Sequence, residues 1–511
     1  MSWSPGPRRT DILRVPLRLI TPRRNIASVL KVAWVIVLWI GEVGVFWRAA
    51  AKCQFPVHLD GVPSHKVVLI GDPQITDPYS YHRRGVLQWV TEFYSDLYMR
   101  RNWRNLMKRR KRNRVDTVIF MGDLMDGGRE WEDDAYVSIA DVSDLVIQSG
   151  CQRYLEEAKR FKNLFVAPRE DVKFIYMAGN HDLGFGNGVT VARQDRFAAE
   201  FNLPNQIFDM GNHSVVLLDT VSITSQDANV RAAVETLLNQ VQDTQLPRIL
   251  LTHVPLWRDD ATDCGPLRQA SDTITQGNGY QYQNLMDASM STRLLTTVKP
   301  DLVFSGDNHD YCEIVHSYQA NGERQATEIT VPTFSMAQGL LRPGVILLTL
   351  QNPLDTNAPS LASSTYSRST CFFPDQVNIF INYAYIALIT IIIIILTLLR
   401  RHKTQNVYRM LKRNNNAFRL PLHLLPRRDP QNSVAERTLN LHHNDSDDEQ
   451  ASDDSDDGFS ARRSRFDARA TSGIFVAFRK EYWALLLRDV SEVAAVAVPF
   501  YVFLLVWNRF R

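Results

Sequence analysis

Short acidic, amide and imidazole motifs recur in this chain, each directly after a run of apolar residues. They are Gly71-Asp72-Pro73-Gln74, Gly122-Asp123-Leu124-Met125-Asp126, Gly179-Asn180-His181-Asp182, Thr252-His253 and Gly306-Asp307-Asn308-His309. Carboxylates, amide oxygens and imidazole nitrogens bind divalent metal ions, and carboxylates and imidazoles also transfer protons. Taken singly, each motif is equally explained by a turn, a helix cap or a structural histidine. Five of them in succession predict one metal-dependent site.

The apolar runs that precede these motifs predict β-strands. They cover residues 66–70, 115–121, 173–177, 249–251 and 302–304, and a sixth run covers 214–218. Helical stretches alternate with them, which is typical of an α/β domain. In open α/β sheets, sites form outside the carboxyl ends of the strands. We therefore expect the five motifs to meet at one edge of the sheets.

The order of the motifs resembles the calcineurin-like metallophosphoesterase superfamily, in which D-x-H, G-D-x-x-D, G-N-H-D/E, H and G-H-x-H follow one another. The resemblance covers about residues 66–350 and implies a four-layer α/β/β/α sandwich, with two mixed sheets face to face and helices outside. It also implies two divalent metal ions that share one carboxylate. Carried over by position, the first ion would be bound by Asp72, Gln74, Asp123 and His309. The second would be bound by Asp123, Asn180, His253 and Asp307, with Asp123 as the bridge.

Two positions depart from the superfamily pattern. Gln74 stands where a histidine is usual, and Asp307 replaces the first histidine of G-H-x-H. Both side chains still offer an oxygen, so the implied ligand set is rich in hard donors. Such a set suits manganese or magnesium better than zinc.

The resemblance implies a separate role for His181, which binds no metal in the superfamily pattern. It would stabilise the pentavalent transition state or protonate the leaving oxygen, with Asp126 orienting its ring. Arg129 follows the second motif and could steady a phosphate oxygen, although a surface arginine is an equal explanation.

Further blocks of sequence narrow the resemblance to one branch of the superfamily. GDLMDGGREW, GNHDLGFG, GYQYQN, GDNHDYCEIVH and VPTFSMAQGLLRPG are similar to the ethanolamine-phosphate phosphodiesterases that remodel glycosylphosphatidylinositol (GPI) anchors, especially fungal members. That branch implies removal of ethanolamine phosphate from a mannose of the GPI glycan, with the first mannose favoured, in the endoplasmic reticulum or Golgi. It also implies manganese as the cofactor and GPI-anchored proteins or GPI lipid as the substrate.

Two other functions stay open. A lumenal phosphatase that acts on another sugar, lipid or protein phosphate would share every metal-site residue, and only GYQYQN and FSMAQG argue against it. A non-enzymatic cargo adaptor that kept the fold would need no metal, whereas all seven ligand positions keep a donor atom.

Long apolar runs predict a membrane protein. Residues 27–47 and 377–399 are long enough to cross a bilayer, and residues 490–507, which include Glu492 and Pro499, predict a third span or an interfacial helix. Basic residues precede the first run and follow the second, and the positive-inside rule places both flanks in the cytosol. We therefore expect a cytosolic N-terminus over residues 1–26 and a lumenal catalytic domain over residues 66–350. The acidic, largely disordered tail over residues 400–480 would be cytosolic.

The charges and the cysteines of the chain bear on its partners and on its disulfides. A net charge of +3 gives no reason to expect nucleic acid as a partner. Residues 100–114 hold nine basic residues among apolar ones, which predicts either a helix on anionic membrane lipids or a solvated helix face. An oxidising lumen favours a Cys264–Cys312 disulfide, with five free or buried thiols as the alternative.

Overall fold

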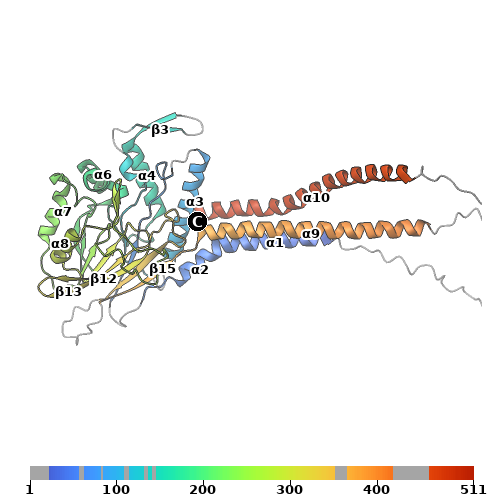
Figure 1. Cartoon of the computed structure of the whole chain (residues 1–511). Coiled ribbons are helices and arrows are strands. Elements are labelled where there is room, and N and C mark those ends of the chain that lie inside the picture. Colours follow the sequence, from blue (N-terminus) through green and yellow to red (C-terminus); the bar gives the residue numbers. More distant parts are fainter. Residues whose placement is uncertain are drawn as a thin grey trace, which may run out of the picture. The chain divides into compact units, whose positions relative to one another are not determined.

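The computed structural model describes residues 22–56, 63–81, 85–108, 114–131, 136–140, 145–351, 365–417 and 460–510 (Figure 1). The chain divides into two compact units. One comprises Ile36–Asn382 and Phe500–Arg511, and it contains all of the predicted site residues. The other comprises Met1–Val35 and Tyr383–Pro499.

A five-stranded mixed sheet is built around the first three predicted strands. β1 (His65–Ile70), β2 (Thr117–Phe120) and β5 (Lys173–Tyr176) are adjacent and parallel. β14 (Gly344–Leu350) and β15 (Tyr366–Phe372) extend the sheet beyond β1 with antiparallel pairing. β2 is buried along its whole length, which explains why three of its four residues are apolar.

A second, six-stranded sheet contains the other three predicted strands. β7 (His213–Leu217), β8 (Arg248–Leu251), β11 (Leu302–Ser305) and β13 (Glu323–Thr330) run parallel to their neighbours in that order. β6 (Gln206–Met210) and β12 (Cys312–Gln319) pair antiparallel at the two edges. All six strands predicted from the sequence are therefore confirmed, with ends that shift by two residues at most.

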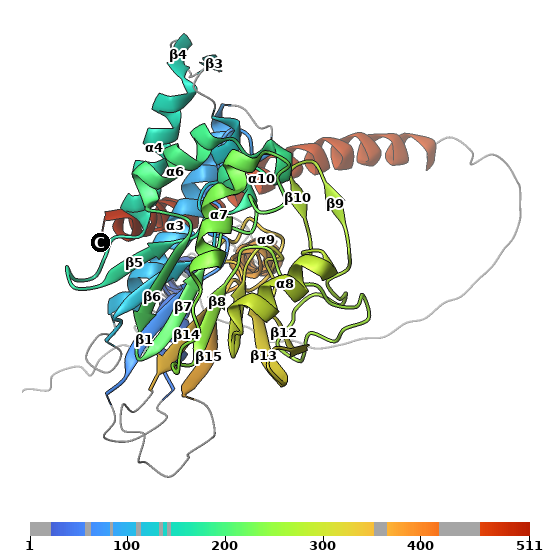
Figure 2. The same ribbon diagram turned by 90° about the vertical axis from the view of Figure 1, so that its left-hand side faces the viewer.

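The two sheets share one buried apolar cluster. It takes Val67, Leu69 and Ile119 from the first sheet and Leu217 and Phe304 from the second. Successive side chains of a strand point to opposite faces, so these residues mark the face that each sheet turns inward. Figure 2 shows strands of both sheets from the side.

Helices pack against the other faces of the strands. Phe120 of β2, for example, lies 5.2 Å from Phe161 of α4, measured between ring centroids. The helices of this unit that follow β1 are α3 (Val86–Lys108), α4 (Gly150–Leu164), α5 (Asn180–Leu183), α6 (Val191–Phe201), α7 (Ala228–Gln240) and α8 (Ala288–Val298). Two small hairpins complete it, β3 (Tyr136–Ala140) with β4 (Leu145–Ser149), and β9 (Asn278–Gly279) with β10 (Tyr282–Gln283).

Three helical segments are long and apolar enough to cross a membrane: Ile26–Lys52, Gln376–Lys412 and Lys480–Phe510. They belong to α1 (Pro22–Trp39) with its continuations η1 (Ile40–Gly44) and α2 (Val45–Lys52), to α9 (Gln376–Ala417) and to α10 (Ser460–Phe510). The charges that interrupt the first and third apolar runs pair with each other, because Lys31 Nζ lies 4.0 Å from Glu492 Oε2. Such pairing is the usual way to keep charged groups in an apolar environment.

The structure describes the two ends of the predicted tail, residues 400–417 and 460–480. α9 continues to Ala417 and α10 begins at Ser460, so both ends of the segment 400–480 are helical. These ends are continuous with the helices that contain the second and third predicted spans. Residues 1–21 and 418–459, which include the arginine-rich N-terminus and the acidic stretch, lie outside the described residues.

One face of the basic segment 100–114 differs from the predicted solvated helix face. Arg101, Trp103 and Met107 of α3 are buried. Arg101 Nη2 lies 2.5 Å from Oε2 of Glu42, which is buried in the π-helical turn η1. This face of α3 therefore contacts protein, whereas Lys108 at the end of the helix is exposed, and a contact of the segment with membrane lipids stays a prediction. Residues 109–113 lie outside the described part.

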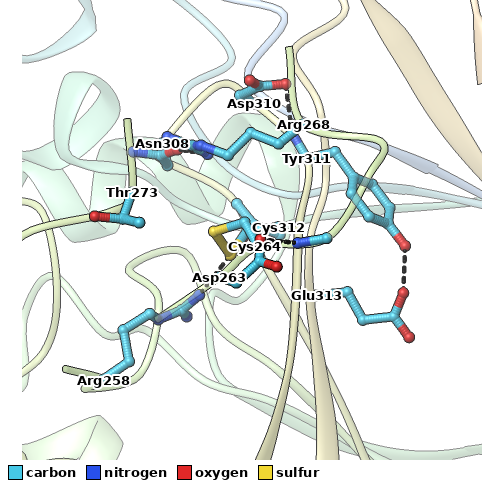
Figure 3. Close-up of a disulfide and its surroundings, with 12 residues drawn as sticks. Arg258, Asp263, Cys264, Arg268, Thr273, Asn308, Asp310, Tyr311, Cys312 and Glu313 are labelled. Atoms are coloured by element: carbon cyan, nitrogen blue, oxygen red, sulfur yellow. Dashed lines mark hydrogen bonds between the residues drawn. A yellow bond between two sulfur atoms is a disulfide. The ribbon is translucent and has the colours of Figure 1, made fainter. Parts of the chain in front are cut away.

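Two disulfides are present among the described residues. The predicted Cys264–Cys312 bond is confirmed, and Arg258 Nη1 donates to the Cys312 sulfur at 3.1 Å (Figure 3). A second bond joins Cys53 to Cys371, with 5.3 Å between the Cα atoms. It links the residue after the first apolar helix to a residue shortly before the second, a pairing that their positions beside the two predicted spans could have suggested.

Candidate metal centre

The predicted ligand residues converge although they come from five separate strand ends. Asp72 and Gln74 follow β1, Asp123 follows β2, and the rest follow β5, β8 and β11. We call Asp72, Gln74, Asp123 and His309 the first donor group, and Asp123, Asn180, His253 and Asp307 the second donor group. The carboxylate and imidazole atoms of each group lie within 4.8 Å of one another, and Asp123 belongs to both. The structure thus brings together every residue that the superfamily pattern assigned to the two ions.

The second donor group is arranged around Nε2 of His253. This nitrogen lies 3.1 Å from Asn180 Oδ1, 3.4 Å from Asp123 Oδ1 and 3.6 Å from Asp307 Oδ1. The other ring nitrogen, Nδ1, lies 2.8 Å from the carbonyl oxygen of Met121, which only accepts hydrogen bonds. Nδ1 therefore holds a ring proton, and Nε2 would present its lone pair to a metal ion once its own proton is displaced, as in a metal-binding histidine.

The first donor group contains buried oxygens that the protein does not satisfy. Asp72 Oδ2 and Gln74 Oε1 have no hydrogen-bond partner within the part of the chain that the structure describes. The amide nitrogen of Gln74 donates to Asp123 Oδ2 at 2.9 Å, so its oxygen points away from that carboxylate. Unsatisfied buried polar atoms are rare and costly. The donor set therefore fits a bound cation.

Backbone strain is concentrated at the same residues. Among the described residues, ten other than glycine have a positive φ, and five of them are predicted ligands: Asp72, Gln74, Asp123, Asp307 and His309. A left-handed backbone costs a residue with a Cβ about 1–2 kcal/mol. Such strain persists only where the surroundings enforce it, and it gathers at functional sites.

Two glycines of the motifs allow this close packing. A Cβ on Gly122 would lie 2.3 Å from His253 Nδ1, and a Cβ on Gly179 would lie 2.1 Å from Asp123 Oδ1. Each of these two glycines therefore makes room for a predicted ligand that follows another strand.

The electrostatics of the site also favour cations. Burial and the neighbouring carboxylates raise the pKa of Asp72 well above its usual range, and burial raises the pKa of Asp307 to about 7. Burial alone would lower the pKa of His253, but Asp123, Asp72 and Asp307 outweigh it and raise that pKa to about 9. Crowded carboxylates of this kind are neutralised when divalent ions bind between them.

His181 and Asp126 lie together beside the shared carboxylate of Asp123, with one difference from the prediction. His181 Nδ1 is 2.5 Å from the backbone carbonyl oxygen of Asp126 and 3.3 Å from its carboxylate Oδ1. The main chain of Asp126 therefore provides the shorter contact to the ring. The backbone N–H of His181 donates to Asp123 Oδ1 at 2.8 Å, which places the histidine beside the shared carboxylate.

Arg129 is held by protein groups. Its Nη1 donates to the carbonyl oxygen of Asn180 at 3.1 Å, and its Nε donates to Glu130 Oε1 at 3.1 Å. The arginine therefore supports the backbone at a predicted ligand.

Sequence reasoning missed two positioning residues. Asp182 accepts hydrogen bonds from the backbone N–H groups of Gly179 and Leu124 at 2.9 and 3.0 Å, and so ties the third motif to the second. Thr220 Oγ1 accepts from the N–H groups of His253 and Val254, at 3.1 Å each. Asp182 was visible in the sequence as the last residue of Gly179-Asn180-His181-Asp182, whereas nothing local marks Thr220.

Comparison with known proteins agrees with this geometry. The family model described as calcineurin-like phosphoesterase matches residues 65–311. Cell division control protein 1 of Saccharomyces cerevisiae is 36% identical over 366 residues, which cover 68% of this chain and 70% of that protein. The chain belongs to the calcineurin-like phosphoesterase family. It is a metal-dependent phosphoesterase, as its motifs predicted.

More distant relatives extend this similarity across animals. Metallophosphoesterase 1 of Xenopus laevis is 24% identical over 383 residues, covering 68% of the phosphoesterase described here and 83% of the relative. The metallophosphoesterase 1 homolog of Caenorhabditis elegans is 23% identical over 334 residues, covering 64% and 82% respectively. The alignments with the yeast and frog proteins, over 366 and 383 residues, are longer than the segment 65–311 that the family model matches.

Proposed function

We propose that this phosphoesterase is a phosphodiesterase that removes ethanolamine phosphate from a mannose of the GPI glycan, the first mannose being favoured, in the endoplasmic reticulum or Golgi. The observation that carries the hydrolytic part is the pair of donor groups that share Asp123, with His181 beside them. The substrate rests on the sequence blocks GYQYQN and VPTFSMAQGLLRPG. GPI lipid or GPI-anchored proteins are the proposed partners.

Two divalent ions bound by the donor groups would polarise the phosphoryl oxygens and activate the attacking water. His181 is the proposed acid. Because its Nδ1 proton is held by the carbonyl of Asp126, only Nε2 is available to the substrate. As the phosphorus–oxygen bond to mannose breaks, Nε2–H of the protonated ring donates its proton to the mannose oxygen. Water supplies the hydroxyl on phosphorus, and its remaining proton restores the ring.

We propose manganese as the metal. The donors are three carboxylates, the amide oxygens of Gln74 and Asn180, and only two imidazoles, which is a set that suits hard cations.

We also propose three membrane spans, with the N-terminus and the tail in the cytosol and the catalytic domain in the lumen. A hydrogen bond at the end of α10 supports the third span. Asn508 Nδ2 donates to the carbonyl oxygen of Glu42 at 3.3 Å, so the end of α10 lies beside the first apolar helix within the catalytic unit. Two disulfides support an oxidising compartment. Protease treatment of sealed microsomes tests this topology: digestion of the segment 72–309 without detergent would contradict it.

For the fold, we propose the four-layer α/β/β/α arrangement, supported by the apolar cluster that both sheets share and by the aromatic packing of β2 against α4.

The function is tested with purified, manganese-loaded protein on a GPI glycan that bears ethanolamine phosphate, and on a simple phosphomonoester. We expect release of ethanolamine phosphate from the glycan and much slower hydrolysis of the monoester. Mass spectrometry of GPI glycans from cells that lack the protein should show retained ethanolamine phosphate. Hydrolysis of the monoester alone would favour a phosphatase with another substrate, and failure to bind metal would favour an adaptor.

A further inference from the structure

The β9–β10 hairpin contains a strained residue that the metal chemistry alone does not explain. Tyr282 pairs with Gly279, so Tyr280 and Gln281 form its two-residue turn. Gln281 has a φ of 60°, and Tyr280 is not among the residues with positive φ. Turns of this pattern favour glycine at the second position, and another residue there costs about 1–2 kcal/mol. Gln281 must therefore make compensating contacts.

Those contacts join the hairpin to the segment that follows Asn180. The Gln281 side-chain oxygen accepts from the backbone N–H of Phe185 at 2.7 Å. Its amide group occupies a space that exists only because residues 184 and 188 are glycines. A Cβ on Gly188 would lie 2.0 Å from the amide atoms, and one on Gly184 would lie 2.7 Å from Oε1.

The backbone of Gln281 reaches the second donor group itself. Its carbonyl oxygen accepts from Asn180 Nδ2 at 3.0 Å. With the nitrogen held there, the other end of the amide, Oδ1, faces His253 Nε2 at 3.1 Å. The hairpin thus decides which end of the Asn180 amide is presented to a metal ion, which is a positioning role.

The hairpin also presents aromatic rings next to this contact. Tyr280 is 77% exposed and Tyr282 is 43% exposed. Tyr282 lies over Gly279, since a Cβ there would be 2.2 Å from its ring, and so it supports the turn. Tyr280 directly precedes Gln281 and leaves most of its ring open to solvent. An exposed ring one residue from a metal-ligand contact can bind the apolar C–H face of a sugar that carries the scissile phosphate.

We propose that the β9–β10 hairpin couples substrate recognition to the metal centre: Tyr280 binds a hexose ring of the glycan, and Gln281 orients Asn180. The first half rests on the proposed function, because it takes a mannose phosphodiester as the substrate. The second half concerns only the metal centre.

The positioning half is tested by filling the space that Gln281 occupies. Gly188 has an ordinary backbone conformation, so Gly188→Ala adds a clash with Gln281 without straining its own main chain. We expect Gly188→Ala and Gln281→Ala to weaken the tighter Mn²⁺ binding step of metal-stripped protein, measured by calorimetric titration, by about tenfold. Gly44→Ala is the control, because its added Cβ meets nothing nearer than 3.8 Å. Unchanged Mn²⁺ affinity in both variants would overturn the positioning role.

The recognition half is tested by comparing two substrates. Tyr280→Ser should lower the ratio of kcat/KM for a synthetic mannose–ethanolamine phosphodiester to that for bis(p-nitrophenyl) phosphate by about tenfold, mainly through KM. Tyr408→Ser, which removes a ring that is 68% exposed on α9, is the control and should leave this ratio unchanged. An unchanged ratio in Tyr280→Ser, or an equal loss on both substrates, would overturn the recognition role. If the unmodified protein hydrolyses only the aryl diester, the proposed function fails, while the Mn²⁺ titration still decides the positioning role.

Discussion

The two donor groups share a carboxylate but differ in how the protein holds their other members. In the second donor group, the outward atoms have partners: His253 Nδ1 lies against Met121 O, and Asn180 Nδ2 donates to Gln281 O. In the first donor group, the Gln74 nitrogen donates inside the group, and its oxygen and Asp72 Oδ2 have no hydrogen-bond partner among the described residues. The second donor group is therefore oriented in advance, while the first would be completed by a bound ion. We expect the second group to bind its ion more tightly.

The strongest test of this comparison is the loss of the shared carboxylate. Asp123→Ala removes a ligand from both groups, so we expect both ions to be lost and hydrolysis to fall about 10³-fold or more. Metal content by mass spectrometry and kcat/KM measure the two effects. A protein that kept both ions would show that Asp123 is not the bridge.

A comparable loss of turnover should follow from a residue outside both groups. His181→Ala removes the proposed acid, and we expect kcat to fall about 10²–10⁴-fold. Both Mn²⁺ binding steps should stay unchanged, because the contact of this residue with Asp123 is made by its backbone N–H. Loss of metal from His181→Ala would assign the ring to a donor group.

Acid should weaken the contacts of Glu328, a buried carboxylate that supports the loop after His253 of the second donor group. Buried Glu328 accepts from the N–H of Leu256, on the loop after His253, at 3.1 Å, and it pairs with Arg258 at 2.9 Å and His316 at 2.6 Å. Burial alone would raise its pKa, but Arg258 and His316 outweigh that effect and lower it from 4.5 to about 2. A carboxyl with a depressed folded-state pKa stabilises the fold fully above pH 4.5, and this contribution disappears as the pH falls towards 2.

The size of this contribution is about 3 kcal/mol. We expect thermal unfolding of the protein to become easier between pH 5 and pH 3. Glu328→Gln should be less stable at pH 7 and should lose less stability over that interval. Glu323→Gln, on an exposed position of the same strand, is the control. Parallel pH profiles for Glu328→Gln and the unmodified protein would contradict the prediction.

The smallest expected effect is a change of metal preference in the first donor group. We expect metal-stripped protein to recover activity best with manganese, and Gln74→His to shift the preference towards zinc or iron by about tenfold, because an imidazole replaces an amide oxygen. Asp307→His makes the matching change in the second donor group and should shift the metal preference less. Equal or better reactivation of the unmodified protein by zinc would show that ligand hardness does not govern this site.

The strands and the positions of the site residues could be predicted from the sequence alone. Buried strands such as β2 consist mostly of apolar residues, and each site motif follows its strand directly, so both signals are local. The glycines of the motifs are local signals too, although the contacts that require them, such as Gly122 against His253, span more than a hundred residues. The favoured Cys264–Cys312 bond could be proposed because both cysteines fall in late loops of one domain.

How the site residues are held depends on the folded arrangement of the chain. The left-handed backbone at Asp72 and Asp123 is enforced by neighbouring strands, so no propensity of aspartate predicts it. The contact of His181 with the carbonyl of Asp126 depends on the path of the main chain. The Asn180–Gln281 hydrogen bond joins residues 101 positions apart, and the Cys53–Cys371 bond joins residues 318 positions apart. Contacts at such separations arise from the folded arrangement of strands and loops, and no periodicity in the sequence encodes them.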